Sequence, residues 1–174
     1  PFIPFSKPFV SDSEINSVIE VMKSGWLTTG SKSKKFEEVF NKFISPDDHT
    51  YSISVNSATA GLHLALEACG ISKGDEVITS TLTFTATAEV VRYLGAEVKL
   101  VDIDPETMNI DANKIEEAIS SKTKALMPVH YAGLSCDMDK IISIAKKHNL
   151  KVIEDAAHAL PSNFKNKRIG SLDP

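Results

Sequence analysis

Short β-rich runs alternate with amphipathic helical stretches from residue 51 to residue 154, and this alternation is the strongest constraint on the fold. Each helical stretch is long enough to return the chain across a sheet, so that consecutive strands can lie parallel. A sheet of this kind is covered by helices on both faces. The pattern therefore predicts an α/β fold with three layers, α/β/α, around a mainly parallel sheet. Strands are expected at 51–55, 76–80, 97–101, 125–129 and 151–154, and helices at 57–69, 85–94, 112–120 and 138–148.

The first 50 residues follow a helical pattern. Ser11 and Glu14 form a capping-box sequence that opens one helix, and Gly25 ends it. Apolar side chains between residues 36 and 43 mark a second amphipathic helix. We therefore expect an N-terminal helical segment, 1–50, followed by a domain that starts at residue 51 and continues to residue 174. The polar stretch 162–174 is expected to begin a ribbon, with the sequence ending inside the domain.

Composition and charge narrow the class of protein. Hydrophobic residues make up 42% and charged residues 24% of the chain, which is ordinary for a soluble globular protein. The net charge of −4 gives no electrostatic reason to expect nucleic acid or an anionic membrane as a partner. Cys69 and Cys136 form no CxxC motif, which favours a reducing, cytoplasmic location. No apolar run has the length of a membrane span, and nothing resembles a signal peptide.

Small and hydroxyl side chains open the helix expected at 57–69. Ser57, Ala58 and Thr59 follow directly after an expected strand. A helix N-terminus offers free N–H groups and the positive end of the helix dipole, which suit a phosphate group. A plain N-cap would have the same composition, so both interpretations stay open. Phe84 lies at another strand-to-helix turn, where its ring could stack on a flat cofactor or join the core.

Asp155 and His158 follow the last expected strand, at the sheet edge where ligands bind in α/β proteins. An acid after a buried strand is costly unless it is paired, so Asp155 could hold a protonated ring nitrogen, cap a helix or form a salt bridge. His158 could bond the phenolic oxygen of the same cofactor or be structural. With the two groups above, these residues predict a pyridoxal phosphate site. No metal is expected, because His130, Cys136, Asp137 and His158 match no standard zinc spacing.

The order and spacing of these motifs resemble the sugar aminotransferases of the DegT/DnrJ/EryC1/StrS family. The resemblance implies the aspartate-aminotransferase (type I) fold of PLP-dependent transferases, with 51–174 as an incomplete, truncated PLP-binding large domain. It looks closest to enzymes that aminate 4-keto nucleotide sugars, such as arabinose-type aminotransferases. The motifs that carry it are SGWLTTG (24–30), SATAGLH (57–63), GDEVIT (74–79), PVHYAG (128–133) and IEDAAHA (153–159).

The resemblance also implies roles for the site residues. The 57–59 segment would hold the phosphate of pyridoxal 5'-phosphate, and Phe84 would stack on its ring. Asp155 would pair with the ring nitrogen and His158 would contact the ring hydroxyl. Thr28 and Thr29 resemble a loop that lines the nucleotide-sugar side.

In members of this family an amino group moves from an amino acid, usually glutamate, to a keto nucleotide sugar. The products serve the synthesis of lipopolysaccharide and other surface polysaccharides. Because type I enzymes build each site from two subunits, the resemblance implies a homodimer.

The lysine content departs from the family pattern. The family's Schiff-base lysine is expected just beyond Pro174, and Lys151, Lys165 and Lys167 are not placed to replace it. We therefore expect no catalytic lysine in this chain and no transaminase activity from the chain by itself. Two alternatives stay open. One is a non-catalytic binding or assembly protein of the same fold, and the other is the family's lysine-free sugar dehydratase.

Overall fold

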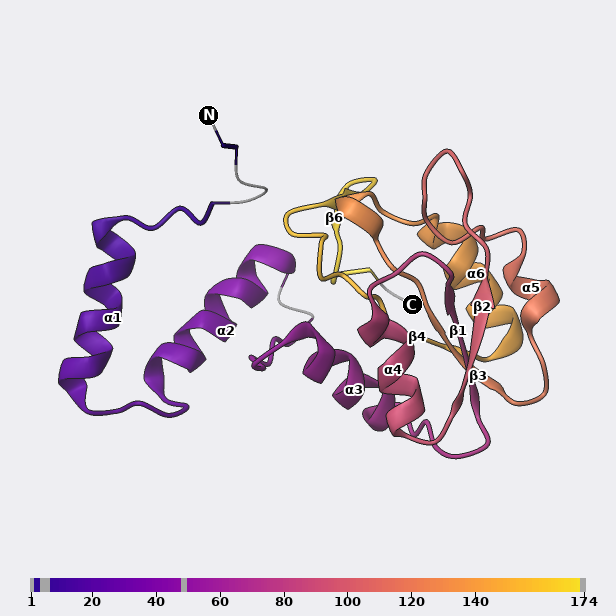
Figure 1. Ribbon diagram of the computed structural model, residues 1–174, viewed down its shortest axis with the longest axis horizontal. Coiled ribbons are helices and arrows are strands. Elements are labelled where there is room, and N and C mark those ends of the chain that lie inside the picture. Colours follow the sequence, from indigo (N-terminus) through magenta and orange to yellow (C-terminus); the bar gives the residue numbers. More distant parts are fainter. Residues whose placement is uncertain (1, 4–6, 48–49, 173–174) are drawn as a thin grey trace.

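The structure is a computed structural model that describes residues 2–3, 7–47 and 50–172. Figure 1 shows how the helices and strands follow one another along the chain. In chain order they are α1 (Asp12–Ser24), α2 (Ser31–Ile44), α3 (Ala58–Ala68), β1 (Glu76–Ser80), α4 (Thr85–Tyr93), β2 (Glu97–Val101), α5 (Ile115–Ala118), β3 (Thr123–Met127), the 3-10 turn η1 (Tyr131–Gly133), α6 (Met138–His148), β4 (Lys151–Val152), β5 (Asn163–Phe164) and β6 (Lys167–Arg168).

Four strands form a parallel sheet in the order β2-β1-β3-β4. β1 pairs with β2 along its whole length and with β3 after a register shift between Glu76 and Val77. β4 pairs with β3 through Lys151 and Val152. β5 and β6 form a separate antiparallel ribbon. The prediction of an α/β fold built on a mainly parallel sheet is therefore confirmed.

Helices cover both faces of the sheet. Val77 and Ile78 are both fully buried, although adjacent strand residues point to opposite faces. Val77 packs in one apolar cluster with Leu66 of α3 and Val90 of α4. Ile78 packs in a second cluster with α5 and with Ile141 of α6. Figure 1 shows the two pairs of helices on opposite sides of the strands, which gives the three expected layers.

The two N-terminal helices lie to one side of the sheet (Figure 1). The expected capping box opens α1, because the Ser11 hydroxyl accepts from the Ser13 N–H (3.3 Å) and the Glu14 carboxylate accepts from the Ser11 N–H (2.6 Å). Gly25 ends α1 with a left-handed φ of 71°. No residue of α1 is buried, and Met22 on its apolar side is 62% exposed. None of the helices in the described ranges combines the length and apolarity that a membrane crossing requires.

The strand expected at 51–55 is wrong, because this segment pairs with no strand in the described part of the chain. Its polar groups bond to α2 instead: the N–H and the hydroxyl of Ser54 donate to the Glu37 carboxylate at 2.8 and 2.7 Å. Tyr51 is 96% and Ile53 81% exposed. The apolar alternation suits a strand, but a strand also needs a neighbouring edge, and the described residues offer none here.

The helix expected at 112–120 is shorter than predicted. A turn at Asp111 delays the start of α5 to Ile115: the Asp111 carboxylate accepts from the Asn113 N–H (3.0 Å) and its carbonyl accepts from the Lys114 N–H (3.0 Å). Local bonds from aspartate side chains compete with helix formation in this way. Asp111 therefore organises a turn that precedes α5.

The two C-terminal strands of the sheet also end earlier than expected. β3 stops at Met127 because Pro128 has no N–H to continue the ladder. β4 stops at Val152, and beyond it Val129 and Asp155 meet only in an isolated parallel bridge. The segments that follow these strands are therefore free to turn into the site described below.

Glu37 gives a first testable prediction. Hydrogen bonds from the N–H and hydroxyl of Ser54 lower the pKa of the Glu37 carboxyl below its ordinary value of 4.5. A carboxyl with a depressed folded-state pKa stabilises the fold above its unfolded-state pKa, and this contribution is lost as the pH falls. We expect the unfolding free energy of Glu37→Gln to depend less steeply on pH in the acidic range than that of the parent. Urea unfolding over a pH series measures this, with Glu38→Gln on the same helix as the control. Equal slopes in parent and Glu37→Gln would contradict the prediction.

Candidate functional site

A cavity of about 210 Å³ lies where segments that follow three strands of the sheet meet. Phe84 comes after β1, Val129 after β3 and Asp155 after β4. The first turn of α3 forms a further wall. This is the carboxyl edge of a parallel sheet, where ligands bind in open α/β folds. The lining residues are Ala58, Thr59, Leu62, Phe84, Ala86, Val129, Tyr131, Asp155, Ala157 and His158.

Residues of the first turn of α3 line this cavity. Ser57 is the N-cap, because its hydroxyl accepts from the Ala60 N–H at 3.1 Å. Ala58 and Thr59 line the cavity. The N–H groups of a first helical turn lack partners within the helix, and the helix dipole adds partial positive charge. This turn could hold a phosphate group, with Ser57 in the capping role that was the alternative interpretation.

Asp155 brings a buried carboxylate to the cavity, with only 6% of the residue exposed. Its Oδ2 accepts from the Thr87 hydroxyl at 2.7 Å, and its Oδ1 accepts from the Ala157 N–H at 3.2 Å. Its backbone bonds to Pro128 and His130 and so stays beside the end of β3. No cationic side chain among the described residues forms an ion pair with it. The carboxylate could accept a hydrogen bond from a protonated ring nitrogen of a ligand in the cavity.

Phe84 and His158 supply two rings to the same cavity. Phe84 is the N-cap of α4 and is 74% exposed, so it is not a core residue. The His158 ring lies edge-on to the Tyr131 ring, with 6.3 Å between the centroids. An exposed aromatic ring can stack on a flat ligand, and an imidazole can hydrogen-bond the edge of that ligand.

Two residues at the site were missed by the sequence prediction. Thr87 of α4 bonds directly to Asp155, and Tyr131 lines the cavity beside His158. Thr87 lies 68 residues from Asp155, so no local spacing reveals the contact. The available signal was a hydroxyl on the buried side of a helix, at helical spacing from Val90 and Val91.

A buried pair behind the cavity joins the segments after β3 and β4. His130 is fully buried, and its Nδ1 accepts from the Cys136 N–H at 3.1 Å. The ring proton therefore lies on Nε2, which donates to the Glu154 carboxylate at 2.8 Å. This bond fixes the spacing between the segments that carry Tyr131 and Asp155. In the described ranges, no three His, Cys, Asp or Glu side chains are grouped closely enough to hold a metal ion.

Cys136 gives a second testable prediction. Burial, together with the nearby Glu154 carboxylate, raises the pKa of the Cys136 thiol to about 12. Because the thiolate is the reactive form, we expect a maleimide at neutral pH to modify the half-buried Cys69 and to leave Cys136 free until the chain unfolds. Intact mass before and after denaturation measures this. Cys69→Ser should show no adduct in the native state, and rapid labelling of that variant would contradict the prediction.

Thr28 and Thr29 lie outside the cavity that contains Asp155. Thr28 lines a separate surface depression between α1 and α2. The carbonyl of Thr29 accepts from the Trp26 indole N–H at 3.0 Å. Figure 1 shows this connection at the end of the two N-terminal helices, away from the sheet. The structure therefore brings five of the six expected cofactor residues together around one cavity, with Ser57 as the cap of the adjoining helix, but it does not bring these two threonines there.

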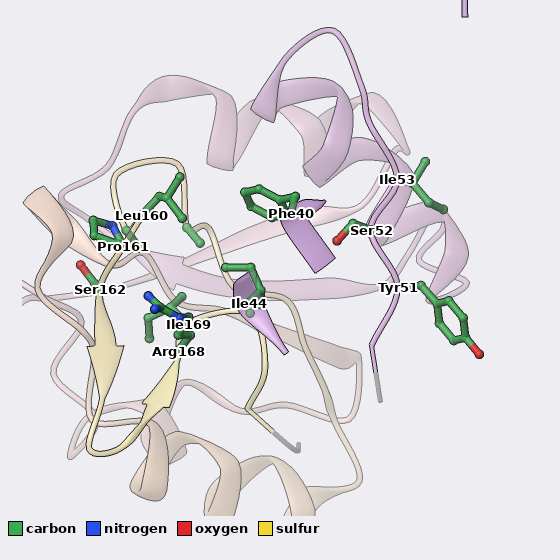
Figure 2. Close-up of a pocket in the computed structure, with 13 residues that line it drawn as sticks. Phe40, Ile44, Tyr51, Ser52, Ile53, Leu160, Pro161, Ser162, Arg168 and Ile169 are labelled. Atoms are coloured by element: carbon green, nitrogen blue, oxygen red, sulfur yellow. The ribbon is translucent and has the colours of Figure 1, made fainter. Parts of the chain in front are cut away.

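A second cavity, of about 270 Å³, lies between α2, the 51–53 segment and the C-terminal ribbon. Figure 2 shows Phe40 and Ile44 reaching it from α2. Arg168 is the one charged side chain that the described residues bring to this lining, and its guanidinium lies 3.8 Å from the centre of the Phe43 ring. Asp155, Phe84 and the start of α3 are not part of its lining. The smaller cavity is therefore the one whose groups fit a cofactor with a phosphate, a flat ring and a ring nitrogen.

The lysines considered from the sequence lie elsewhere, and no lysine among the described residues lines the Asp155 cavity. Lys165 pairs with the Asp139 carboxylate on α6. Lys151 begins β4, whereas the cavity lies beyond the other end of that strand. Lys167 lines a different depression beside the ribbon.

Comparison with known proteins gives one family. The sequence pattern of the DegT/DnrJ/EryC1/StrS aminotransferase family matches residues 8–174. The uncharacterized protein MJ1066 of Methanocaldococcus jannaschii is 50% identical over 98% of the chain and 44% of its own length. The spore coat polysaccharide biosynthesis protein SpsC of Bacillus subtilis is 47% identical over 98% of the chain and 43% of its own length. The chain thus spans less than half the length of these relatives.

A solved structure matches the fold closely. The putative sugar aminotransferase Spr1654 from Streptococcus pneumoniae superposes with a TM-score of 0.91 and 35% identity, over 97% of this chain and 46% of its own. That protein has been solved in a PMP form, a PLP form and an apo form.

Proposed function

This chain belongs to the DegT/DnrJ/EryC1/StrS aminotransferase family, and we propose that it is the cofactor-binding portion of a sugar aminotransferase that uses pyridoxal 5'-phosphate. The proposal rests on one observation above the others. Asp155, a buried carboxylate held by a buried hydroxyl, lines a cavity that also has a helix N-terminus and an exposed aromatic ring. These groups match the ring nitrogen, the phosphate and the flat ring of that cofactor.

The residues of the cavity would divide the binding between them. The first turn of α3, with Ser57 as its cap, would hold the phosphate through backbone N–H groups. Phe84 would stack on the ring, and His158 would bond its phenolic oxygen. The Asp155 carboxylate would accept the N–H of the ring nitrogen and so keep that nitrogen protonated. When bound, the cofactor supplies an aldehyde that takes up amino groups and a ring that withdraws electrons.

The proposed reaction moves an amino group from glutamate to a keto nucleotide sugar, for the synthesis of a surface polysaccharide or lipopolysaccharide. The similarity to SpsC, a spore coat polysaccharide biosynthesis protein, and to a pneumococcal putative sugar aminotransferase supports the transfer to a sugar and the link to polysaccharide synthesis. We place the protein in the cytoplasm, where nucleotide sugars and amino-acid donors are available. Residues 51–174 would be the cofactor domain, and residues 1–50 a helical segment that precedes it.

The proposal includes a homodimer. The apolar side of α1 is exposed, and the Thr28–Thr29 loop lies away from its own cavity. A second copy that covers α1 and α2 would bury this apolar surface and could receive the loop at the sugar side of its own site. Sedimentation at increasing concentration tests the dimer. A monomer at every concentration would contradict it.

We also propose that this chain binds the cofactor without a covalent link, because no lysine of the described ranges lines the cavity. The test is an ultraviolet-visible titration with pyridoxal 5'-phosphate, followed by borohydride reduction and intact mass. We expect saturable binding and no adduct after reduction. An adduct on one defined lysine would contradict the missing-lysine proposal, and the chain should then be assayed for transamination. Absence of any binding would contradict the cofactor proposal itself.

A further inference from the structure

A chain of two threonine hydroxyls ends at the carboxylate of Asp155. The Thr83 and Thr87 hydroxyl oxygens are 2.6 Å apart, and the Thr87 hydroxyl is 2.7 Å from Asp155 Oδ2. Thr87 is fully buried in the first turn of α4, whereas Thr83 is partly buried in the loop before that helix. Both distances lie within the usual range for O–H···O hydrogen bonds.

The direction of the two bonds follows from the number of protons available. An ionised carboxylate can only accept, so the single hydroxyl proton of Thr87 points to Asp155. The remaining lone pairs of Thr87 can then only accept, and Thr83 must be the donor to it. The two hydroxyls thus form an ordered relay of donors, Thr83 to Thr87 to Asp155. In a buried position such bonds strengthen one another.

Packing of the core does not by itself account for a hydroxyl group at position 87. Thr87 shares the buried side of α4 with Val90 and Val91, where a valine of nearly the same shape would bury no polar atom. A buried hydroxyl without a partner is costly, so its bond to Asp155 accounts for its presence. Charge-assisted donors favour the ionised form of a carboxylate, and the first turn of α4 adds the positive end of a helix dipole beside it.

We propose that Thr87, supported by Thr83, is a positioning residue that holds the Asp155 carboxylate aimed at the cofactor ring, so that this carboxylate can accept the N–H of the ring nitrogen. This inference rests on the proposed function, because it assumes that Asp155 meets that nitrogen. Without the Thr87 hydroxyl, the carboxylate loses the donor that orients it, and its hydrogen bond to the ring N–H weakens. The protonated form of the ring nitrogen is then stabilised less.

Pyridoxamine 5'-phosphate labelled with ¹⁵N in the ring is the probe, since it binds without a lysine. Its nitrogen chemical shift reports where the proton lies, and a titration gives the Kd. Parent and Thr87→Ser should give the protonated shift at neutral pH. Thr87→Val should move the shift towards the unprotonated value and weaken binding about tenfold, the effect of one hydrogen bond to a charged group. Thr85→Val makes the same change at an exposed position of α4 and should match the parent.

Each outcome decides the inference. A parent-like nitrogen shift in bound Thr87→Val would overturn it, and so would a Thr87→Ser variant that behaves like Thr87→Val. If Thr87→Val does not fold, Thr83→Val takes its place, because Thr83 is only partly buried. We expect this variant to move the ¹⁵N chemical shift in the same direction by a smaller amount. An unchanged ¹⁵N shift would contradict the relay. If the parent chain binds no probe at all, the proposed function fails together with this inference.

Discussion

Replacing Asp155 with asparagine should raise the Kd for pyridoxamine 5'-phosphate about 10- to 100-fold, because hydrogen bonds to charged groups contribute about 1.5–3 kcal/mol. Asparagine keeps the shape of the side chain and an oxygen for the Thr87 hydroxyl. It removes the negative charge that a protonated ring nitrogen requires. The larger loss should therefore appear in binding, while the fold loses the bond that Asp155 Oδ1 accepts from the Ala157 N–H at 3.2 Å. Isothermal titration of parent and variant, at the same pH and salt, measures it.

Asp139→Asn is the matched control for this experiment. This variant also replaces an aspartate with an asparagine, but on α6, where the exposed Asp139 carboxylate pairs with Lys165. Surface ion pairs contribute little, so this variant should bind the probe as the parent does. Equal Kd values for parent and Asp155→Asn would show that the ring nitrogen does not meet this carboxylate.

Leu66→Ala should lower the unfolding free energy by about 2–5 kcal/mol. Leu66 lies in the middle of the layer that α3 and α4 form on the sheet, and it is fully buried. Truncation removes apolar contacts with the strands and leaves a cavity that the neighbouring side chains fill only in part. Since α3 also positions Ala58 and Thr59, cofactor affinity should fall in the same variant even where the chain remains folded.

Leu64→Ala isolates burial as the cause, because it makes the same truncation on the same helix. Leu64 is 53% exposed, so the expected change is within about 0.5 kcal/mol. Urea unfolding followed by circular dichroism gives both values. If the two variants were equally destabilised, α3 would not be anchored through its sheet-facing side, and the layer order described here would be wrong.

The sequence predicted the architecture because periodicity is a local signal. Val77 and Ile78 stand next to each other and are both buried, as in the central strands of a covered parallel sheet. The prediction failed where a partner outside the local window decides the outcome. The 51–55 segment has the composition of a strand but no edge to pair with. α5 begins later than predicted because the Asp111 side chain accepts a local hydrogen bond that competes with helix formation over a few residues.

The candidate site followed a similar division. Residues 57–59, Phe84, Asp155 and His158 were predicted from their places at strand and helix ends, and the fold gathers them around one cavity except for Ser57, which caps the adjoining helix. Thr87 was missed because its role is defined by a contact with Asp155 across 68 residues of chain. Their roles in cofactor binding stay predictions until the titrations above are made.

The strand order β2-β1-β3-β4 also determines when the cavity can exist during synthesis of the chain. α3, β1 and α4 leave the ribosome first, but Asp155 follows β4, which can join the sheet only after β3 is in place. Domains fold as their residues emerge, at about 5–20 residues per second. Any arrangement that these early elements reach must therefore form without help from a ligand in this cavity. A cofactor in this cavity can therefore bind only after β4 has joined the sheet. Its binding then shifts the folding equilibrium towards the folded chain by mass action.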